Sequence, residues 1–191
     1  IKVHINKKRI EESYNFQAEN YRGSKQIAEL LLRDMQIPSN PIGLDIGCGD
    51  GVTTFALYEN CNKQGQIYGL DISQRMVEKA SENKRKLGYN DINFIKGDAE
   101  SLNFPDNMFD VVISLYTFQF FPDKLKALKE MYRVLRPGGR LGLYFPAGKE
   151  FQREIFEIFK KIEKRHLELS QLNHVMKEYG EMHIKLEEFQ D

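Results

Sequence analysis

The chain has 191 residues, and its 28 Lys and Arg residues balance 28 Asp and Glu residues, so the formal net charge is zero. A balanced charge gives no bulk attraction to nucleic acid or to an anionic membrane, and no apolar run is long enough to span a bilayer. The length and the 41% hydrophobic content favour one globular domain with a substantial core. Two cysteines are too few for a disulfide framework, so we expect reduced thiols, a cytoplasmic location and no metal site.

The first 40 residues are predicted to form a helical cap ahead of the first strand. Tyr14, Phe16 and Tyr21 stand among polar residues there, and Ser24 is placed to cap a helix with apolar residues at helical spacing. This aromatic segment either folds over a ligand or packs on the edge of a sheet, and the sequence leaves both alternatives open.

A short apolar run and a glycine-rich turn follow at Ile42–Gly51, and a helix begins at Val52. Glycine lacks a Cβ atom, so such a turn brings backbone close to a ligand, and the N-terminus of the next helix favours an anion. Asp45, at the end of the predicted strand, favours a cation. The two preferences together fit the carboxylate and ammonium groups of an amino acid moiety. Cys48 is interpreted as a small residue that fills the turn rather than as a nucleophile.

The spacing of the glycines separates this turn from a dinucleotide site. Gly47 and Gly49 match the first two glycines of the fingerprint G-x-G-x-x-G, but Val52 stands where the third belongs, and the additional glycine is Gly51. This departure counts against a nicotinamide or flavin dinucleotide. The other alternative is a tight turn without a ligand, against which the acidic residues further along the chain argue.

Two more predicted strands, Gln66–Leu70 and Ile92–Gly97, are each followed by an aspartate. Asp71 lies at the separation from the glycine turn that is expected for an acid that binds ribose hydroxyls. Its alternative role, capping the next helix, fits Ser73 better. Asp98 is placed to accept a hydrogen bond from an exocyclic amine such as that of adenine. Three successive strands therefore end in a carboxylate, which favours a ligand across this edge of the sheet.

The fourth predicted strand, Phe109–Ser114, is continuously apolar, as in a buried parallel strand. The aromatic stretch Leu115–Phe121 that follows is either a pocket wall or core. After a helix over Lys124–Leu135 that Asp123 caps, the fifth strand is predicted over Arg140–Phe145. Right-handed connections give an α/β fold with a doubly wound, Rossmann-like, mostly parallel sheet in the order 3-2-1-4-5.

Beyond Pro146 apolar residues recur at helical spacing, so we predict one long helix or two in series over residues 147–191 and no further strand. This segment is expected to cover the acceptor side of the site. The fifth strand is then an edge that is left open, covered by the helices, or paired with a second copy in a homodimer. The expected organisation is one domain with a helical cap at 1–40, a core at 41–146 and a helical segment at 147–191.

Four motifs carry a resemblance to a known family, and they follow one another as LDIGCGDG (Leu44–Gly51), GLDIS (Gly69–Ser73), GDAESLNFPDNMFDVVIS (Gly97–Ser114) and LKEMYRVLRPGG (Leu128–Gly139). In these motifs the chain resembles class I S-adenosylmethionine-dependent methyltransferases, especially the small-molecule branch similar to ubiquinone and menaquinone biosynthesis methyltransferases. Members of that family usually end in an antiparallel hairpin of two more strands. We expect that hairpin to be missing here, and its two strands to be supplied by residues beyond Asp191.

The resemblance implies S-adenosylmethionine as the cofactor and S-adenosylhomocysteine as the product. It places the methionine part beside the glycine turn, the ribose beside the second strand, the adenine beside the residues after the second and third strands, and the sulfonium beside the end of the fourth strand. The implied cofactor contacts are Asp45, Gly47, Cys48, Gly49, Asp71, Ile72, Met76, Asp98, Ala99, Ser114 and Leu115.

The implied reaction is an in-line displacement at the sulfonium methyl by a small-molecule acceptor. The protein then mainly has to align the reactants and exclude water. No general base is evident, and Tyr21, Tyr116 and His174 are the candidates on the substrate side. One alternative function is a binding or interaction module that holds S-adenosylmethionine without turnover. Another, a nicotinamide-dependent oxidoreductase, is disfavoured by Val52.

Overall fold

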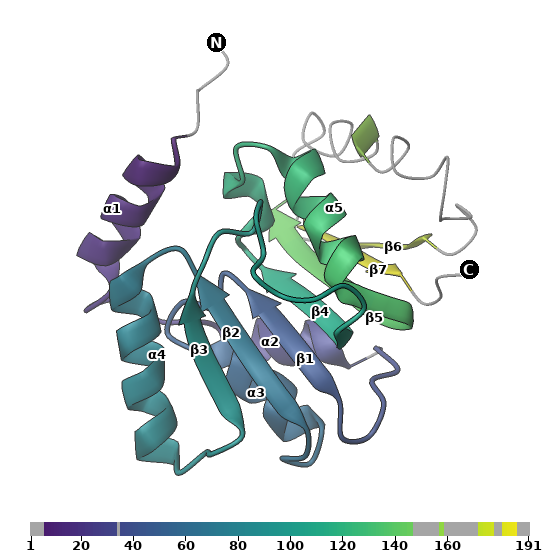
Figure 1. The fold of residues 1–191 in the computed structure, drawn as a ribbon, viewed down its shortest axis with the longest axis horizontal. Coiled ribbons are helices and arrows are strands. Elements are labelled where there is room, and N and C mark those ends of the chain that lie inside the picture. The colour runs from purple at the N-terminus through teal and green to yellow at the C-terminus, as the bar shows by residue number, and fades with distance from the viewer. Residues whose placement is uncertain (1–5, 34, 147–156, 159–171, 178–180, 187–191) are drawn as a thin grey trace.

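The computed structural model describes residues 6–33, 35–146, 157–158, 172–177 and 181–186. Within this part of the chain, seven strands form one sheet in the order β3-β2-β1-β4-β5-β7-β6 (Figure 1). The strands are β1 (Ile42–Ile46), β2 (Gln66–Asp71), β3 (Ile92–Lys96), β4 (Phe109–Leu115), β5 (Leu135–Pro146), β6 (Leu172–Lys177) and β7 (Glu181–Leu186).

The first five strands are all parallel, and β1 pairs with both β2 and β4, which confirms the predicted order 3-2-1-4-5. Every residue of β4 is buried, as its continuous apolar run predicted. β5 begins at Leu135, earlier than the predicted start at Arg140. Because the five strands run the same way, their carboxyl ends, and the loops that follow them, meet at one edge of the sheet.

The helices are α1 (Lys7–Gln17), α2 (Lys25–Leu32), α3 (Val52–Asn60), α4 (Gln74–Leu87), the 3₁₀ turn η1 (Phe118–Phe120) and α5 (Lys124–Val134). Side chains of Ser24, Ser73 and Asp123 accept hydrogen bonds from backbone N–H groups at the starts of α2, α4 and α5. These contacts confirm the three predicted N-caps.

Helices cover both faces of the sheet. Alternate residues of a strand point to opposite faces. Accordingly, Val112 of β4 belongs to a core layer that includes Leu128 of α5. Its neighbour Val111 belongs to a second layer that includes Leu31 of α2 and Leu57 of α3. The sheet is thus buried between two helical layers, and its carboxyl edge is left for a site.

The C-terminal part of the chain corrects the prediction of a purely helical segment. β7 pairs antiparallel with β5, and β6 pairs antiparallel with β7. The prediction that the hairpin is missing and is supplied from beyond Asp191 is therefore wrong, because the chain itself forms it. The spacing of Leu172 and Met176, four residues apart, suggested a helix. A spacing of four also fits a strand, in which side chains alternate between the two faces with a period of two.

β5 is consequently not an exposed edge, and this overturns the predicted homodimer through that strand. Strand β7 takes up the backbone groups through which a second copy would have paired. His174 lies on β6 and not on a terminal helix. Glu157 and Ile158 are helical, but the rest of the predicted helix over 147–171 lies outside the described residues. Among the helices that are described, none has the length and apolar character needed to cross a membrane.

Candidate active site

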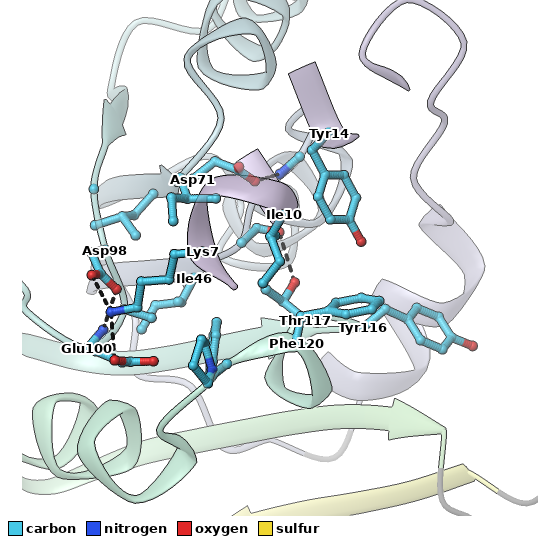
Figure 2. Close-up of a pocket in the computed structure, with 18 of the residues that line it drawn as sticks. Lys7, Ile10, Tyr14, Ile46, Asp71, Asp98, Glu100, Tyr116, Thr117 and Phe120 are labelled. Carbon is cyan, nitrogen blue, oxygen red and sulfur yellow. Dashed lines mark hydrogen bonds and ion pairs between the residues drawn. The ribbon is translucent and has the colours of Figure 1, made fainter. Parts of the chain in front are cut away.

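A cavity lies at the carboxyl ends of the parallel strands (Figure 2). Its wall comes from the loops after β1, β2, β3 and β4, and α1 contributes Lys7, Ile10 and Tyr14. The cavity volume is about 60 Å³, which is small beside the roughly 300–1,000 Å³ of small-molecule sites. The N-terminal aromatic segment therefore folds over the candidate site, one of the two alternatives that the sequence left open.

The glycine loop after β1 has the backbone geometry that only glycine adopts easily. Gly47 and Gly49 have φ values of +76° and +54°. A Cβ atom on Gly47 would lie 2.2 Å from Oγ1 of Thr117, and one on Gly49 would lie 2.9 Å from the ring of Tyr21. Both positions thus combine a left-handed conformation with a close approach of side chains from across the cavity.

The N–H groups of this loop are bonded to the end of β2. Those of Gly47 and Cys48 donate to the carbonyl of Leu70, at 2.7 and 3.0 Å. The N–H of Gly49 donates to Oδ2 of Asp71 at 2.9 Å. Strand β2 therefore fixes the shape of the loop, because all three N–H groups are bonded to it in this conformation.

Asp71 is held from two sides at the cavity wall. Besides the bond from Gly49, its Oδ1 accepts a hydrogen bond from the N–H of Ser73 at 2.8 Å. Burial is the main cause that raises the pKa of Asp71, and the backbone hydrogen bonds oppose it. The cap of α4 is Ser73, as expected, so Asp71 is not needed as a cap. Each carboxylate oxygen has a second lone pair, which leaves Asp71 able to accept hydrogen bonds from a ligand.

Asp45 is fully buried in β1 and does not line the cavity. Its Oδ2 accepts a hydrogen bond from the hydroxyl of Thr54 at 2.7 Å, whereas its Oδ1 is buried without a hydrogen-bond partner. Burial raises the pKa of Asp45 to about 7. Among the residues that the structure describes, none donates a hydrogen bond to this oxygen, so the carboxylate behind the glycine loop favours a positive charge nearby.

Asp98, which the sequence predicts on the adenine side, is joined to a second acid, Glu100, by a residue that the sequence did not indicate. Lys7 pairs with Asp98 at 2.7 Å and with Glu100 at 2.6 Å, as Figure 2 shows. Glu100 is buried, and its backbone N–H donates to the other oxygen of Asp98 at 2.9 Å. Asp98 therefore stands at the cavity with one oxygen bonded to Lys7 of α1 and the other to the backbone of Glu100.

Aromatic rings form the roof on the other side of the cavity. The ring of Tyr14 lies edge-on to those of Tyr21 and Phe120, at 6.3 and 6.0 Å between centroids. Tyr116 also lines the cavity, with φ of +55°, an unusual value for a residue other than glycine. Burial raises the pKa of Tyr21 to about 12, so near neutral pH its phenol is a hydrogen-bond donor rather than a base.

The predicted site residues divide into those that line the cavity and those that do not. The first group is Tyr21, Gly47, Gly49, Asp71, Ile72, Asp98, Ala99 and Tyr116. The second group consists of buried residues and is Asp45, Cys48, Met76, Ser114 and Leu115. Ser114, for example, donates from its hydroxyl to the carbonyl of Ile46 at 2.9 Å and so ties β4 to β1. His174 lies on β6, which β5 and β7 separate from β4.

Several wall residues escaped the sequence reasoning. Lys7 and Ile10 belong to a helix whose position no local pattern fixes. Glu100 had a detectable signal, because it follows Asp98 by two residues at the end of the third strand. The aromatic stretch after β4 was expected to be either a pocket wall or core, and it is both. Phe120 lines the cavity, and Phe118 is fully buried in the core.

The sheet of this protein is parallel over its first five strands, with a glycine loop after β1 and acids at the ends of β2 and β3. These features define a Rossmann-like protein that binds a nucleotide-containing cofactor at the carboxyl edge of its sheet. Residues 39–185 match the family described as "Methyltransferase domain", which is most of the chain. The chain belongs to this family, within the class I S-adenosylmethionine-dependent methyltransferases.

Similar proteins agree with this assignment. The demethylmenaquinone methyltransferase of Anoxybacillus flavithermus is 37% identical over 110 residues, which are 58% of this chain and 46% of that protein. The demethylmenaquinone methyltransferase of Listeria welshimeri is 31% identical over 168 residues, 82% of this chain and 71% of that protein. The chain thus spans about half the length of the first of these relatives. A crystal structure of an S-adenosylmethionine-dependent methyltransferase from Aquifex aeolicus shares the fold, with a TM-score of 0.73, 20% identity, and coverage of 90% of this chain and 98% of that chain.

Proposed function

We propose that this protein transfers a methyl group from S-adenosylmethionine to a small-molecule acceptor of the demethylmenaquinone type. The observation that carries the proposal is Asp71, which two backbone N–H groups hold in the cavity wall at the end of β2. That is the position at which this kind of fold binds a ribose. The names of the curated relatives support the acceptor class.

The residues present fit the cofactor. Asp71 is to accept from the ribose hydroxyls and Asp98 from the adenine amine, with Ile72 and Ala99 in the wall near the base. The glycine loop lets backbone come close to the methionine part, and Thr117 and Tyr21 stand where Cβ atoms on Gly47 and Gly49 would lie. The unpartnered oxygen of Asp45 favours the ammonium group from behind the loop.

When bound, S-adenosylmethionine supplies a methyl group whose carbon–sulfur bond breaks with its electron pair left on sulfur, as the acceptor forms the new bond to carbon. The work of the chain is alignment and exclusion of water. Tyr14, Tyr116 and Phe120 offer ring faces and edges that suit a flat aromatic acceptor. Tyr21 stays protonated and serves as a donor beside the glycine loop.

The alternative of a binding module without turnover was suggested by a missing hairpin. That hairpin is present as β6 and β7, so the reason for this alternative no longer holds. The test is isothermal titration with S-adenosylmethionine, followed by a transfer assay with cofactor that carries a labelled methyl group. Reduced demethylmenaquinone is compared with a single-ring phenol of similar polarity as the acceptor. Formation of labelled product and S-adenosylhomocysteine with the first acceptor supports the proposal. Binding without product from either acceptor favours the binding module.

A pH dependence of cofactor binding is expected to vanish in Asp45→Asn. Because the pKa of this buried carboxyl rises from 3.8 to about 7, the folded protein keeps a proton that the unfolded chain has already released. The free energy of unfolding therefore decreases as pH rises across this interval and is level above it. The ammonium group of the cofactor, in turn, binds more tightly as pH rises through 7 and the carboxylate becomes charged.

Titrations with S-adenosylmethionine and urea unfolding between pH 5.5 and 8.5 check both effects. In Asp45→Asn, the cofactor affinity should no longer increase as pH rises near 7. The free energy of unfolding should no longer decrease as pH rises toward 7. Asp106→Asn is the control, since that side chain is 69% exposed at its ion pair with Arg133. A rise in affinity of the same size in Asp45→Asn and in the unmodified protein would contradict the proposed role of this carboxylate.

A further inference from the structure

α1 is held on the domain mainly by polar contacts. None of its residues is buried, and Phe16 near its end is 85% exposed. Helices in proteins usually owe their stability to a packed apolar face. The position of α1 beside α4, visible in Figure 1, therefore depends on individual hydrogen bonds and ion pairs.

Asn15 joins α1 to a buried side chain of α4. Its Oδ1 atom accepts a hydrogen bond from the hydroxyl of Ser73 at 2.6 Å and another from the backbone N–H of Arg75 at 3.3 Å. Ser73 is fully buried. A neighbouring link, the ion pair of Arg75 with Glu19, lies between exposed side chains, and such pairs contribute little net stability.

Lys79 of α4 fixes the point at which the chain leaves α1. Its ammonium group donates to the carbonyl of Ala18 and, at 2.8 Å, to that of Tyr21. These acceptors follow the last turn of α1, so Lys79 holds one end of the helix. Near the other end, Lys7 pairs with Asp98 and Glu100, and Glu11 pairs with Lys96 at 2.6 Å, through long side chains that are in part exposed. Asn15, through its short side chain and a buried partner, adds a contact that fixes α1 against α4.

The partner of Asn15 also reaches the proposed cofactor site. The N–H of Ser73 donates to Asp71 at 2.8 Å, and Asp71 in turn accepts from the N–H of Gly49 at 2.9 Å. A continuous chain of hydrogen bonds thus runs from α1 through the start of α4 to the glycine loop.

Another side of α1 faces the cavity. Ile10 and Tyr14 line it, as Figure 2 shows, and the ring of Tyr14 touches the roof. With α1 in place the cavity volume is about 60 Å³, far below the roughly 300 Å³ at the lower end for small-molecule sites. α1 is thus the part of the wall whose displacement would open the cavity to a cofactor of nucleoside size.

We propose that Asn15 is a positioning residue that docks α1 on α4 and thereby closes the cofactor cavity. The inference rests on the proposed function, since closure matters only where a cofactor binds. Asn15 acts through Ser73, whose hydroxyl is oriented at the start of α4 and whose N–H holds Asp71. Docking then brings Tyr14 over the site and excludes water during methyl transfer.

Three variants separate docking from a general effect on the helix. Asn15→Leu keeps the size of the side chain and removes both hydrogen bonds. Asn15→Asp keeps the acceptor oxygens, and the start of α4 favours its negative charge. Gln17→Leu is the matched control, because Gln17 is exposed and its hydrogen bond, 2.8 Å to Ser13, stays within α1.

The readouts are hydrogen–deuterium exchange of the cofactor-free protein and titration with S-adenosylmethionine. In Asn15→Leu we expect faster exchange over residues 7–17 with unchanged exchange in β1 to β5, and cofactor affinity about tenfold weaker, which is the effect of two ordinary hydrogen bonds. Asn15→Asp and Gln17→Leu should resemble the unmodified protein in both measurements.

Unchanged exchange over residues 7–17 in Asn15→Leu would overturn the docking role. An equal loss of protection in Gln17→Leu would overturn it too, because the cause would then be the stability of the helix alone. If the unmodified protein bound no S-adenosylmethionine, the proposed function would fail, whereas the exchange data, obtained without cofactor, would still decide whether Asn15 docks α1.

Discussion

Gly47→Ala is expected to reduce cofactor affinity by about 100-fold or more and to destabilise the domain. The new Cβ atom would lie 2.2 Å from Oγ1 and 2.3 Å from Cγ2 of Thr117, at a φ of +76°. A left-handed conformation costs an alanine about 1–2 kcal/mol, and overpacking adds about 1–3 kcal/mol. Any relief requires the loop after β1 to move away from the loop after β4, and this displaces the backbone from the methionine part of the cofactor.

Gly88→Ala separates the steric effect from the conformational one. Gly88 has a similar φ of +69°, but a Cβ atom there would meet nothing within 4 Å. This control should lose only the conformational part of the stability and should bind S-adenosylmethionine normally. Urea unfolding and isothermal titration provide both quantities. Near-normal cofactor affinity in Gly47→Ala would show that the glycine loop is a turn and not a binding element.

Asp71→Ala is expected to weaken cofactor binding by at least about 100-fold, because hydrogen bonds to a charged acceptor contribute about 1.5–3 kcal/mol each and the ribose offers two donors. The structure adds a second consequence. The N–H groups of Gly49 and Ser73 lose their acceptor, so the free energy of unfolding should also decrease, by about 1–3 kcal/mol for each group that stays buried. The domain is expected to remain folded.

The control for this variant is Asp91→Ala. Asp91 precedes β3 and accepts a hydrogen bond from the hydroxyl of Tyr58 at 3.2 Å, away from the cavity. It should leave cofactor affinity unchanged. Calorimetric titration gives the affinities, and thermal melting shows that each variant is folded. A folded Asp71→Ala protein with the affinity of the unmodified chain would refute the ribose assignment.

The acids at the strand ends show how far sequence reasoning reaches into the site. Asp71 and Asp98 were expected at the carboxyl edge, and both line the cavity, because Asp71 ends β2 and Asp98 lies two residues beyond β3, so the strands set their positions. Asp45 was expected beside them but is buried behind the loop. The difference depends on which way a side chain points near the end of β1, and that of Asp45 points to where the hydroxyl of Thr54 in α3 donates to it at 2.7 Å.

The C-terminal hairpin shows where periodicity fails. An apolar spacing of four fits a helix and also one face of a strand, so the pattern of residues 172–177 does not distinguish them. What decides is β5, whose outer edge has unpaired backbone groups that only another strand can satisfy in a regular way. The local sequence of β6 and β7 does not indicate this requirement, because it arises from β5.

The sequence by itself determined the five parallel strands with their order, the N-caps of α2, α4 and α5, and the family of the protein. These depend on local patterns, in which residues a few positions apart specify the backbone they share. Only the tertiary structure decided that α1 lies against the cavity and that β6 and β7 complete the sheet. Both depend on contacts between distant parts of the chain, such as that of Asn15 with Ser73, 58 residues away. No local pattern encodes such pairs, because their energies exist only once the core has brought the two segments together.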